Sequence, residues 1–351
     1  MLSASGLERA LACESSVVLP QVNTSTEPAA RGTSIHAFVR RVLAGVSKEK
    51  ALAHVEVEHR PTCELIDFRK LGSDLTDVRA EVAYAYDART RAVRVVGVNI
   101  GRNYGPMGPS EIAGTNDFEG TRFDGVPVVA DVKTGMPVTA CAENPQMKFH
   151  ALVRMIATGA QEVEARILYV REGGDVYADC YTFDLFELES FGDELAELLG
   201  RVESAFAQYA EKGHARLSTG DHCRYCGALV SCPAYVSLAR TMATDLEDIG
   251  ARIAALSPEE AGVAWEKAKR IEKLLENVLD GMKAYAIQNT IPLPNGQTVK
   301  SVTFERNDFS RNEALVMLRK KGATDAEVGS LYVPHEVEQV RTVGKKAKRA
   351  A

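Results

Sequence analysis

The sequence predicts an α/β protein in which helices flank a mixed central sheet, with a small α/β appendage at its C-terminal end. Segments rich in β-branched and aromatic residues alternate along the chain with segments whose apolar residues recur at helical spacing. Such alternation is typical of a sheet covered by helices. The composition, with 45% hydrophobic and 26% charged residues, is that of an ordinary globular protein.

The length of 351 residues predicts one main domain and an appendage. The composition changes beyond Tyr235, which predicts a domain at 1–240 and an appendage at 241–351. The formal net charge of −6 argues against a uniformly basic nucleic-acid coat. It leaves DNA binding open, because binding needs only a local basic surface or a metal ion at the point of contact.

The cysteines and the apolar runs bear on the compartment. No apolar run reaches membrane-spanning length, and the first residues lack a basic region followed by an apolar core. Seven cysteines, an odd number, favour a reduced compartment and a metal centre over a disulfide framework. We therefore expect a cytoplasmic protein without a membrane partner. Cys63, Cys141 and Cys180 are isolated and are expected to be structural.

The first predicted helix covers residues 3–12, with Ser3 or Ser5 as its cap. It places Cys13 at the start of the following loop. Taken alone, Cys13 would be a small buried residue.

A second helix is expected to begin at Thr33 as its N-cap and to end at Gly45. His36 lies at the edge of its apolar stripe, where a lone histidine is more often a satisfied core or surface group than a metal ligand. The stripe has the spacing i, i+3, i+4, i+7, i+8 and comprises Ile35, Phe38, Val39, Val42 and Leu43.

The centre of the sheet is predicted as a hairpin of strands at 114–118 and 128–133, because turn-forming Asp-Gly and Glu-Gly pairs separate the two. Residues 81–86 and 92–100 predict two further strands that extend the same sheet. The glycine- and proline-rich residues 101–110 are expected to form a loop.

Charged residues in this hairpin indicate a metal site. Side chains alternate along a strand, so Asp131 and Lys133 project from one face. Burying such charges is costly unless they pair or bind metal, and Asp117 on the partner strand offers a second carboxylate. One or two carboxylates with water and phosphate suit Mg²⁺, and a nearby ammonium can orient a water molecule. The alternative is an ordinary Asp131–Lys133 ion pair on a surface hairpin.

A helix from Pro145 to about Thr158 is expected, with Asn144 as its cap and Gly159 at its end. Strands at 165–170 and 176–183 and a helix at 186–211 follow. The polar residues at spacing i, i+4, i+8 on the first of these helices are Gln146, His150 and Arg154, a pattern that is usually only solvated.

Cys223, Cys226 and Cys232 have the spacing Cys-x2-Cys-x5-Cys, with proline after the last. Three thiolates around one metal need a fourth ligand. Cys13 is a candidate for an iron–sulfur cluster, while zinc with a histidine as fourth ligand is the alternative. The candidate histidines are His214 and His222.

The last third of the chain is expected to hold a helix that begins at Ser257-Pro258-Glu259-Glu260 and carries both an apolar stripe and basic residues. A turn at 294–296, a strand at 299–304 and a helix at 311–321 follow. The basic tail at 345–349 is predicted to be disordered.

Several of these motifs together resemble the PD-(D/E)xK nuclease superfamily and its RecB-like branch. Asp117 with Asp131-Val132-Lys133 is similar to the core signature, and residues 30–36 are similar to the branch's Gly-x-x-x-His helix. Residues 146–150 resemble its Gln-x-x-x-Tyr motif, with His150 in place of tyrosine. The resemblance covers residues 1–240. The four cysteines resemble the iron–sulfur staple of some members, including bacterial recombination nuclease subunits and CRISPR-adaptation exonucleases: Cys13, Cys223, Cys226 and Cys232.

The resemblance implies a restriction-endonuclease-like core and a metal-dependent DNA exonuclease or endonuclease. His36, Asp117 and Asp131 would hold Mg²⁺ or Mn²⁺, Lys133 would position the attacking water, and Gln146 would orient the substrate strand. His150 and Arg154 would face the DNA together with Gln146. The four cysteines would hold a [4Fe–4S] cluster, with zinc as the alternative.

The implied partner is DNA with a free end or a single strand, with a helicase or recombination protein as a possible associate. Repair, recombination, CRISPR adaptation and phage replication are all compatible with these motifs. The competing hypothesis is a non-catalytic DNA-binding subunit with a structural iron–sulfur or zinc staple and a vestigial acidic site.

Overall fold

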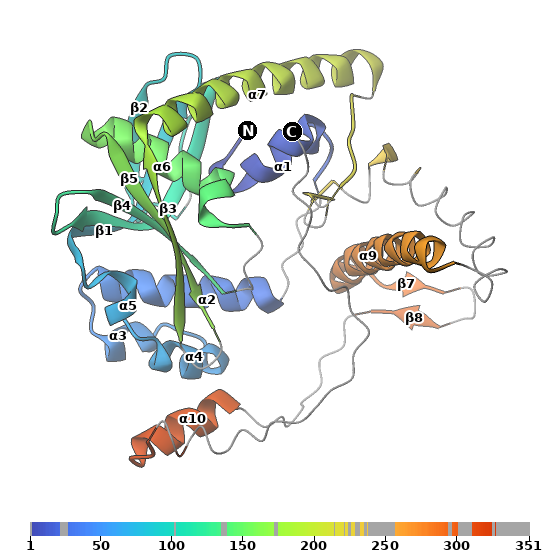
Figure 1. Ribbon diagram of the computed structural model, residues 1–351. Helices are drawn as coiled ribbons and strands as arrows, with labels where there is room; N and C mark the ends of the chain where they lie inside the picture. Colours follow the sequence, from blue (N-terminus) through green and yellow to red (C-terminus); the bar gives the residue numbers. More distant parts are fainter. Residues whose placement is uncertain are drawn as a thin grey trace. The chain divides into compact units, whose positions relative to one another are not determined.

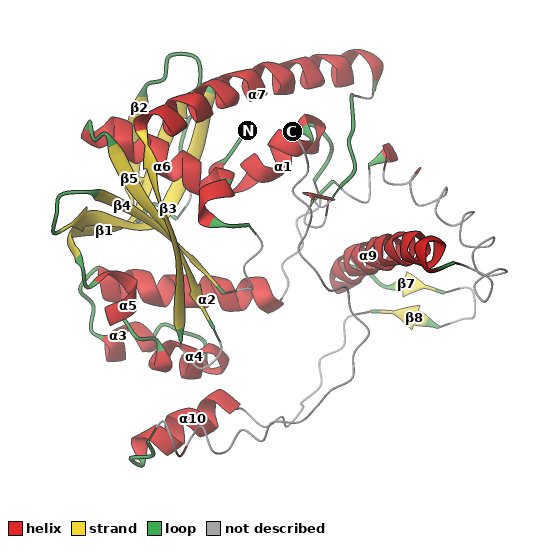
Figure 2. Cartoon of the chain, in the orientation of Figure 1, coloured by secondary structure: helices red, strands yellow, loops and turns green. Residues whose placement is uncertain are grey.

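The structure is a computed structural model in which helices lie on both faces of one central sheet (Figures 1 and 2). It divides into two compact units, Met1–Asn307 and Asp308–Ala351, and each is described by itself. The residues described are 2–21, 27–101, 103–134, 139–171, 175–213, 215–220, 222–223, 226–228, 232–234, 237, 257–293, 297–300, 311–324 and 327.

The sheet has six strands in the order β2-β1-β3-β4-β5-β6. Every neighbouring pair is antiparallel except β4 and β5, which run parallel, so the sheet is mixed as predicted. The strands are β1 (Leu75–Asp87), β2 (Val93–Val98), β3 (Glu111–Arg122), β4 (Pro127–Lys133), β5 (Glu162–Val170) and β6 (Val176–Asp184).

The parallel pair is joined by the crossover helix α6 (Pro145–Thr158), and both of its ends are encoded locally. The Asn144 side chain accepts hydrogen bonds from two backbone N–H groups of the first turn, and Pro145 occupies a position that needs no donor. Gly159 ends the helix with φ 68°, a conformation that glycine adopts without steric cost. These bounds confirm the prediction for this helix.

The two faces of the sheet bury separate apolar cores. Val129 belongs to one core and its neighbour Ala130 to the other, as the alternation of a strand requires. On the first face lie α1 (Leu7–Ala12), α6 and α7 (Leu185–Lys212). On the second lie α2 (Glu27–Leu43), α3 (Lys48–Leu52), α4 (Arg60–Leu65) and α5 (Arg69–Gly72).

One predicted helix start is wrong, and the predicted serine cap of another helix makes no capping hydrogen bond. α2 begins at Glu27, so Thr33 is an exposed residue inside the helix; Pro28 in the first turn is compatible with this earlier start. The first helix is a short 3-10 turn followed by α1, and no serine side chain caps either element, because the hydroxyls of Ser3 and Ser5 lie 3.4 Å from each other instead.

β1 begins six residues earlier than the predicted strand at 81–86. Its first half pairs with the end of β3, but Asp77 (φ 52°) and Glu81 (φ 48°) adopt left-handed conformations. Each such residue interrupts the alternation of side chains, which hides the strand in the sequence pattern. The hairpin of β3 and β4 is confirmed.

The remaining described elements lie beyond residue 256. The helix start is confirmed: in α9 (Pro258–Gln288) Glu260 N–H donates to Ser257 Oγ at 3.2 Å, and Ser257 N–H donates to Glu260 Oε2 at 2.9 Å. The further elements are β7 (Ile291–Pro292), paired with β8 (Thr298–Val299), and α10 (Arg311–Lys320). Outside the described residues lie the predicted domain boundary at 240, the turn at 294–296, most of the strand at 299–304 and the basic tail.

Candidate active site

Asp131 and Lys133 lie at the end of β4 and share one face, as predicted. Lys133 Nζ is 2.7 Å from Asp131 Oδ2, and the two side chains are 39% and 5% exposed. The contact lacks the angles of a hydrogen bond, so Asp131 Oδ2 is buried without a hydrogen-bond donor. This oxygen of Asp131 is therefore paired with the Lys133 ammonium by charge and accepts no hydrogen bond from it.

Asp117 on β3 joins this pair to α2. Its Oδ2 accepts a hydrogen bond of 2.6 Å from the backbone N–H of Val132, and its Oδ1 lies 3.0 Å from His36 Nδ1. The two residues are 81 positions apart in the chain. The buried residues Ile35 and Phe38 dock α2 onto the sheet, which leaves His36 at the margin of the apolar contact.

The electrostatics favour the charged forms of His36 and Asp117. Burial by itself would lower the pKa of His36, but the hydrogen bond and charge of Asp117, with the charge of Asp131, raise it overall. Burial would likewise raise the pKa of Asp117, yet its bonds to His36 and to the Val132 N–H, with the charge of Lys133, hold it below its usual value. Only the neutral imidazole binds metal, so a cation at His36 must displace a proton.

α6 supplies a bridge across the carboxylate and the lysine. Gln146 Nε2 donates to Asp131 Oδ1 at 2.8 Å, and Lys133 Nζ donates to Gln146 Oε1 at 3.2 Å. His150 Nε2 lies 3.5 Å from Gln146 Nε2. Its ring is fully buried, and burial lowers the pKa of His150 to about 4, so the ring is neutral at physiological pH.

Arg154, one turn further along α6, reaches a buried carboxylate that the sequence did not single out. Arg154 Nη1 donates to Glu119 Oε1 at 2.9 Å, and Glu119 is completely buried on β3. Tyr84 O–H and Asn116 Nδ2 each donate to Glu119 Oε2 at 2.9 Å, and Arg79 forms an ion pair with Oε1. The one available signal was position: Glu119 follows Asp117 by two residues in a strand with buried neighbours.

Of the three residues on the predicted DNA-facing side of α6, Gln146 is partly exposed, whereas His150 and Arg154 are buried. Their side chains pack beneath Gln146 and against Glu119. The contact of these three residues with DNA stays a prediction.

The donor set fits a hard divalent cation. Asp131 offers a buried oxygen without a hydrogen-bond donor, Asp117 offers a second carboxylate, and His36 offers a nitrogen. These three ligand atoms do not all lie within 4.8 Å of one another; in the described part of the chain only a group at residues 56–59 does. A cation bound by all three residues would therefore require their ligand atoms to move closer together.

The four cysteines gather where the N-terminal segment meets described residues between 216 and 232. Ser218 Oγ donates to the carbonyl of Ala12 and Ser15 Oγ to that of Arg216, which fastens the N-terminal segment to residues 216–218. Burial and the nearby thiols of Cys226, Cys232 and Cys13 raise the pKa of Cys223, and the same causes act on Cys226. All seven cysteines are unpaired thiols, and these four do not reach the spacing of metal ligands in the described residues.

None of the described helices combines the length and the apolar composition needed to cross a membrane. No curated protein matches the chain. A solved structure described as "Crystal structure of SSO0001" is 16% identical over 65% of this chain and 94% of its own, with a TM-score of 0.27. A family described as "Protein of unknown function (DUF2800)" matches residues 1–327. That match covers most of the sequence, and the chain therefore belongs to the DUF2800 family.

Proposed function

We propose that this protein is a metal-dependent nuclease that hydrolyses phosphodiester bonds in DNA, acting as an exonuclease. The observation that carries the proposal is the convergence of Asp117, Asp131 and Lys133 from adjacent strands with His36 and Gln146 from two helices. Asp131 is buried and the other charged groups are partly exposed, and clusters of interacting charged groups occur preferentially where chemistry needs them.

Mg²⁺ or Mn²⁺ held by His36, Asp117 and Asp131 would neutralise phosphate charge and lower the pKa of a bound water. Lys133 is partly exposed, so its ammonium could donate a hydrogen bond to the attacking water and offset charge on the phosphate oxygens. Gln146 holds Asp131 Oδ1 and Lys133 Nζ at once, so it fixes their relative orientation when substrate enters.

The substrate in this proposal is DNA with a free end or a single strand, and a helicase or recombination protein is the proposed partner class. The four cysteines would hold a [4Fe–4S] cluster that closes the domain, with zinc as the alternative. Support for the cluster is the proximity of the thiols and the two hydrogen bonds that join the segments carrying them.

An anaerobic assay on end-labelled single- and double-stranded DNA, with Mg²⁺ or Mn²⁺, tests the proposal. Wild-type protein should release short products in the presence of either metal, while chelator and Asp131→Asn should each abolish release. The competing hypothesis of a non-catalytic DNA-binding subunit predicts a shift of DNA mobility without cleavage under any metal. That result, obtained with protein that retains its cluster, would overturn the nuclease proposal.

A further inference from the structure

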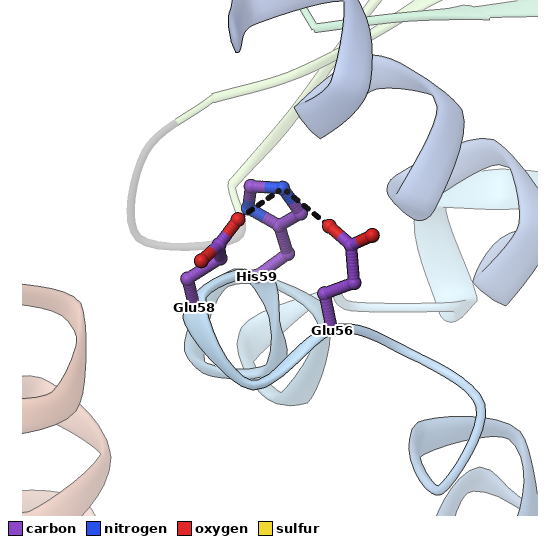
Figure 3. A group of neighbouring side chains, drawn as sticks. All are labelled: Glu56, Glu58 and His59. Atoms are coloured by element: carbon purple, nitrogen blue, oxygen red, sulfur yellow. Dashed lines mark ion pairs between the residues drawn. The ribbon is translucent and has the colours of Figure 1, made fainter. Parts of the chain in front are cut away.

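Three potential metal ligands crowd around η3 (Val57–His59), a short 3-10 turn that leads into α4 (Figure 3). His59 Nε2 lies 3.5 Å from Glu56 Oε2 and 3.5 Å from Glu58 Oε1. The three ligand atoms all lie within 4.8 Å of one another. Figure 3 shows both carboxylates turned toward the imidazole ring.

The histidine at the centre of this group is buried and incompletely satisfied. His59 is 8% exposed, and its Nε2 is buried without a hydrogen-bond partner. Leaving such an atom unsatisfied is unfavourable for the folded state. The side chains of Glu56 and Glu58 are 67% and 73% exposed, so the nitrogen points out of the core toward two solvated carboxylates. A cation would therefore reach the buried nitrogen by way of these two solvated carboxylates.

We propose that Glu56, Glu58 and His59 form a binding site for one Zn²⁺ ion, separate from the candidate nuclease site. Ligands about 2.0–2.1 Å from a tetrahedral zinc ion lie about 3.3 Å from each other, close to the 3.5 Å separations found here. Zinc accepts both nitrogen and oxygen ligands, and the separations of these three ligand atoms are close to those of its tetrahedral shell. Three protein ligands leave one position for water.

The site has a structural consequence. η3 packs against α4 and α2, and α2 carries His36. The three ligands are close in sequence, so zinc bound to them fixes the entry into α4 and stabilises the folded state by mass action. The metal also supplies the partner that His59 Nε2 otherwise lacks.

Zinc binding to full-length protein freed of metal by chelator tests the proposal. Bound zinc is measured by equilibrium dialysis and elemental analysis for wild type, for Glu56→Gln/Glu58→Gln, and for Glu189→Gln/Glu194→Gln. The last variant removes two exposed carboxylates from α7 and matches the charge change. Zinc held by cysteines or by the nuclease carboxylates is common to all three proteins and cancels in the comparison.

The Glu56/Glu58 variant should bind one zinc equivalent fewer than wild type and the α7 control, and zinc should raise its melting temperature less. Equal stoichiometry and half-saturation in all three proteins would overturn the proposal. An equal loss in the α7 control would overturn it too, because binding would then be general attraction to acidic residues. His59→Asn should also bind one zinc ion fewer than wild type. Because this side chain is buried, His59→Asn could fail to fold, and in that case the comparison of the glutamate variants is the deciding test.

Discussion

At the scale of single residues, Asp131 has its two carboxylate oxygens in different environments. Oδ1 accepts a hydrogen bond from Gln146, whereas Oδ2 faces the Lys133 ammonium without hydrogen-bond geometry. A buried ion pair that contributed only stability would have its remaining lone pairs satisfied. The arrangement instead suits a carboxylate that exchanges its lysine partner for a cation.

Asp131 and Lys133 should therefore act as one unit. Asp131→Asn and Lys133→Met are each expected to lower the rate of DNA cleavage by about three orders of magnitude or more, and the double variant should be no worse than either, because groups that act together are not additive. Initial rates on labelled DNA, with DNA binding measured in parallel, check this.

A matched ion pair provides the control. Lys70 and Asp175 also lie 2.7 Å apart, but both are half exposed and remote in sequence from the motifs. Lys70→Met/Asp175→Asn should cleave DNA at the wild-type rate. If the losses in cleavage rate of Asp131→Asn and Lys133→Met multiply in the double variant, the two side chains act independently.

His36 should govern the dependence of activity on metal concentration. His36→Ala is expected to raise the Mn²⁺ concentration for half-maximal cleavage about tenfold or more, with partial recovery at high Mn²⁺, whereas the exposed His54→Ala serves as control. The raised pKa of His36 means that its protonated form is favoured below that pKa, so the wild type should need more Mn²⁺ as pH falls through the imidazole range.

In His36→Ala this pH-dependent part of the metal requirement should disappear. A lower melting temperature with an unchanged Mn²⁺ titration would assign His36 a structural role alone. Metal titrations at several pH values, combined with thermal unfolding, separate these outcomes.

Some residues of the candidate site could be predicted from the sequence and others could not. Strand periodicity alone placed Asp131 and Lys133 on one face, because their separation is local. His36 required the family resemblance, since its contact with Asp117 spans 81 residues and no local rule encodes it. The sequence does not predict a role for Glu119, because its partners come from three different elements. A single glutamate in a strand also forms no sequence motif with its neighbours.

At the scale of elements, the Glu119–Arg154 pair ties β3 to α6 beneath the candidate site. β3 carries Asp117 and α6 carries Gln146, so the pair sets the relation between two side chains of the candidate site. Both partners are buried, and removing one leaves the other charged and partly unpaired.

Arg154→Met is expected to lower the free energy of unfolding by about 3–5 kcal/mol, because it leaves the buried Glu119 carboxylate without this partner. Adding Glu119→Gln to the same protein should restore part of the lost stability, because it removes that buried charge. Urea denaturation measures both. The exposed pair Arg89–Glu203 gives the control, and Arg89→Met should cost less than about 1 kcal/mol. Normal stability of Arg154→Met with weakened DNA binding would instead favour the predicted contact of Arg154 with substrate.

Elements with local stop and start signals were predicted well. α6 has its cap, its first-turn proline and its terminal glycine in sequence, and all three act as expected. The sequence predicts the start of α2 too far along the chain, because Thr33 is a residue type that often caps helices but here lies inside one. The early half of β1 was missed because two left-handed residues break its alternation.

At the scale of the whole molecule, residues 12–19 close against described residues between 216 and 232. Ala12 and Ser15 bond to residues 216–218, and Leu19 packs in one apolar cluster with Cys223 and Cys232. Spacing alone indicated three clustered thiols but not which residue would complete the set, because Cys13 is far from the other three in sequence. In the structure Cys13 lies near Cys223 and Cys226.

The four cysteines should therefore bind one cluster that locks this closure. Anaerobically purified protein is expected to be brown with about four irons per chain, and Cys13→Ser should lose both iron and colour and melt at a lower temperature. Cys180→Ser, at an exposed cysteine, should keep them. Colourless protein with one zinc per chain would assign the site to zinc, and loss of colour in Cys180→Ser but not in Cys13→Ser would refute the ligand set. Because a cross-link between distant segments restricts the unfolded chain most, loss of the cluster should destabilise the core more than loss of a surface ion pair does.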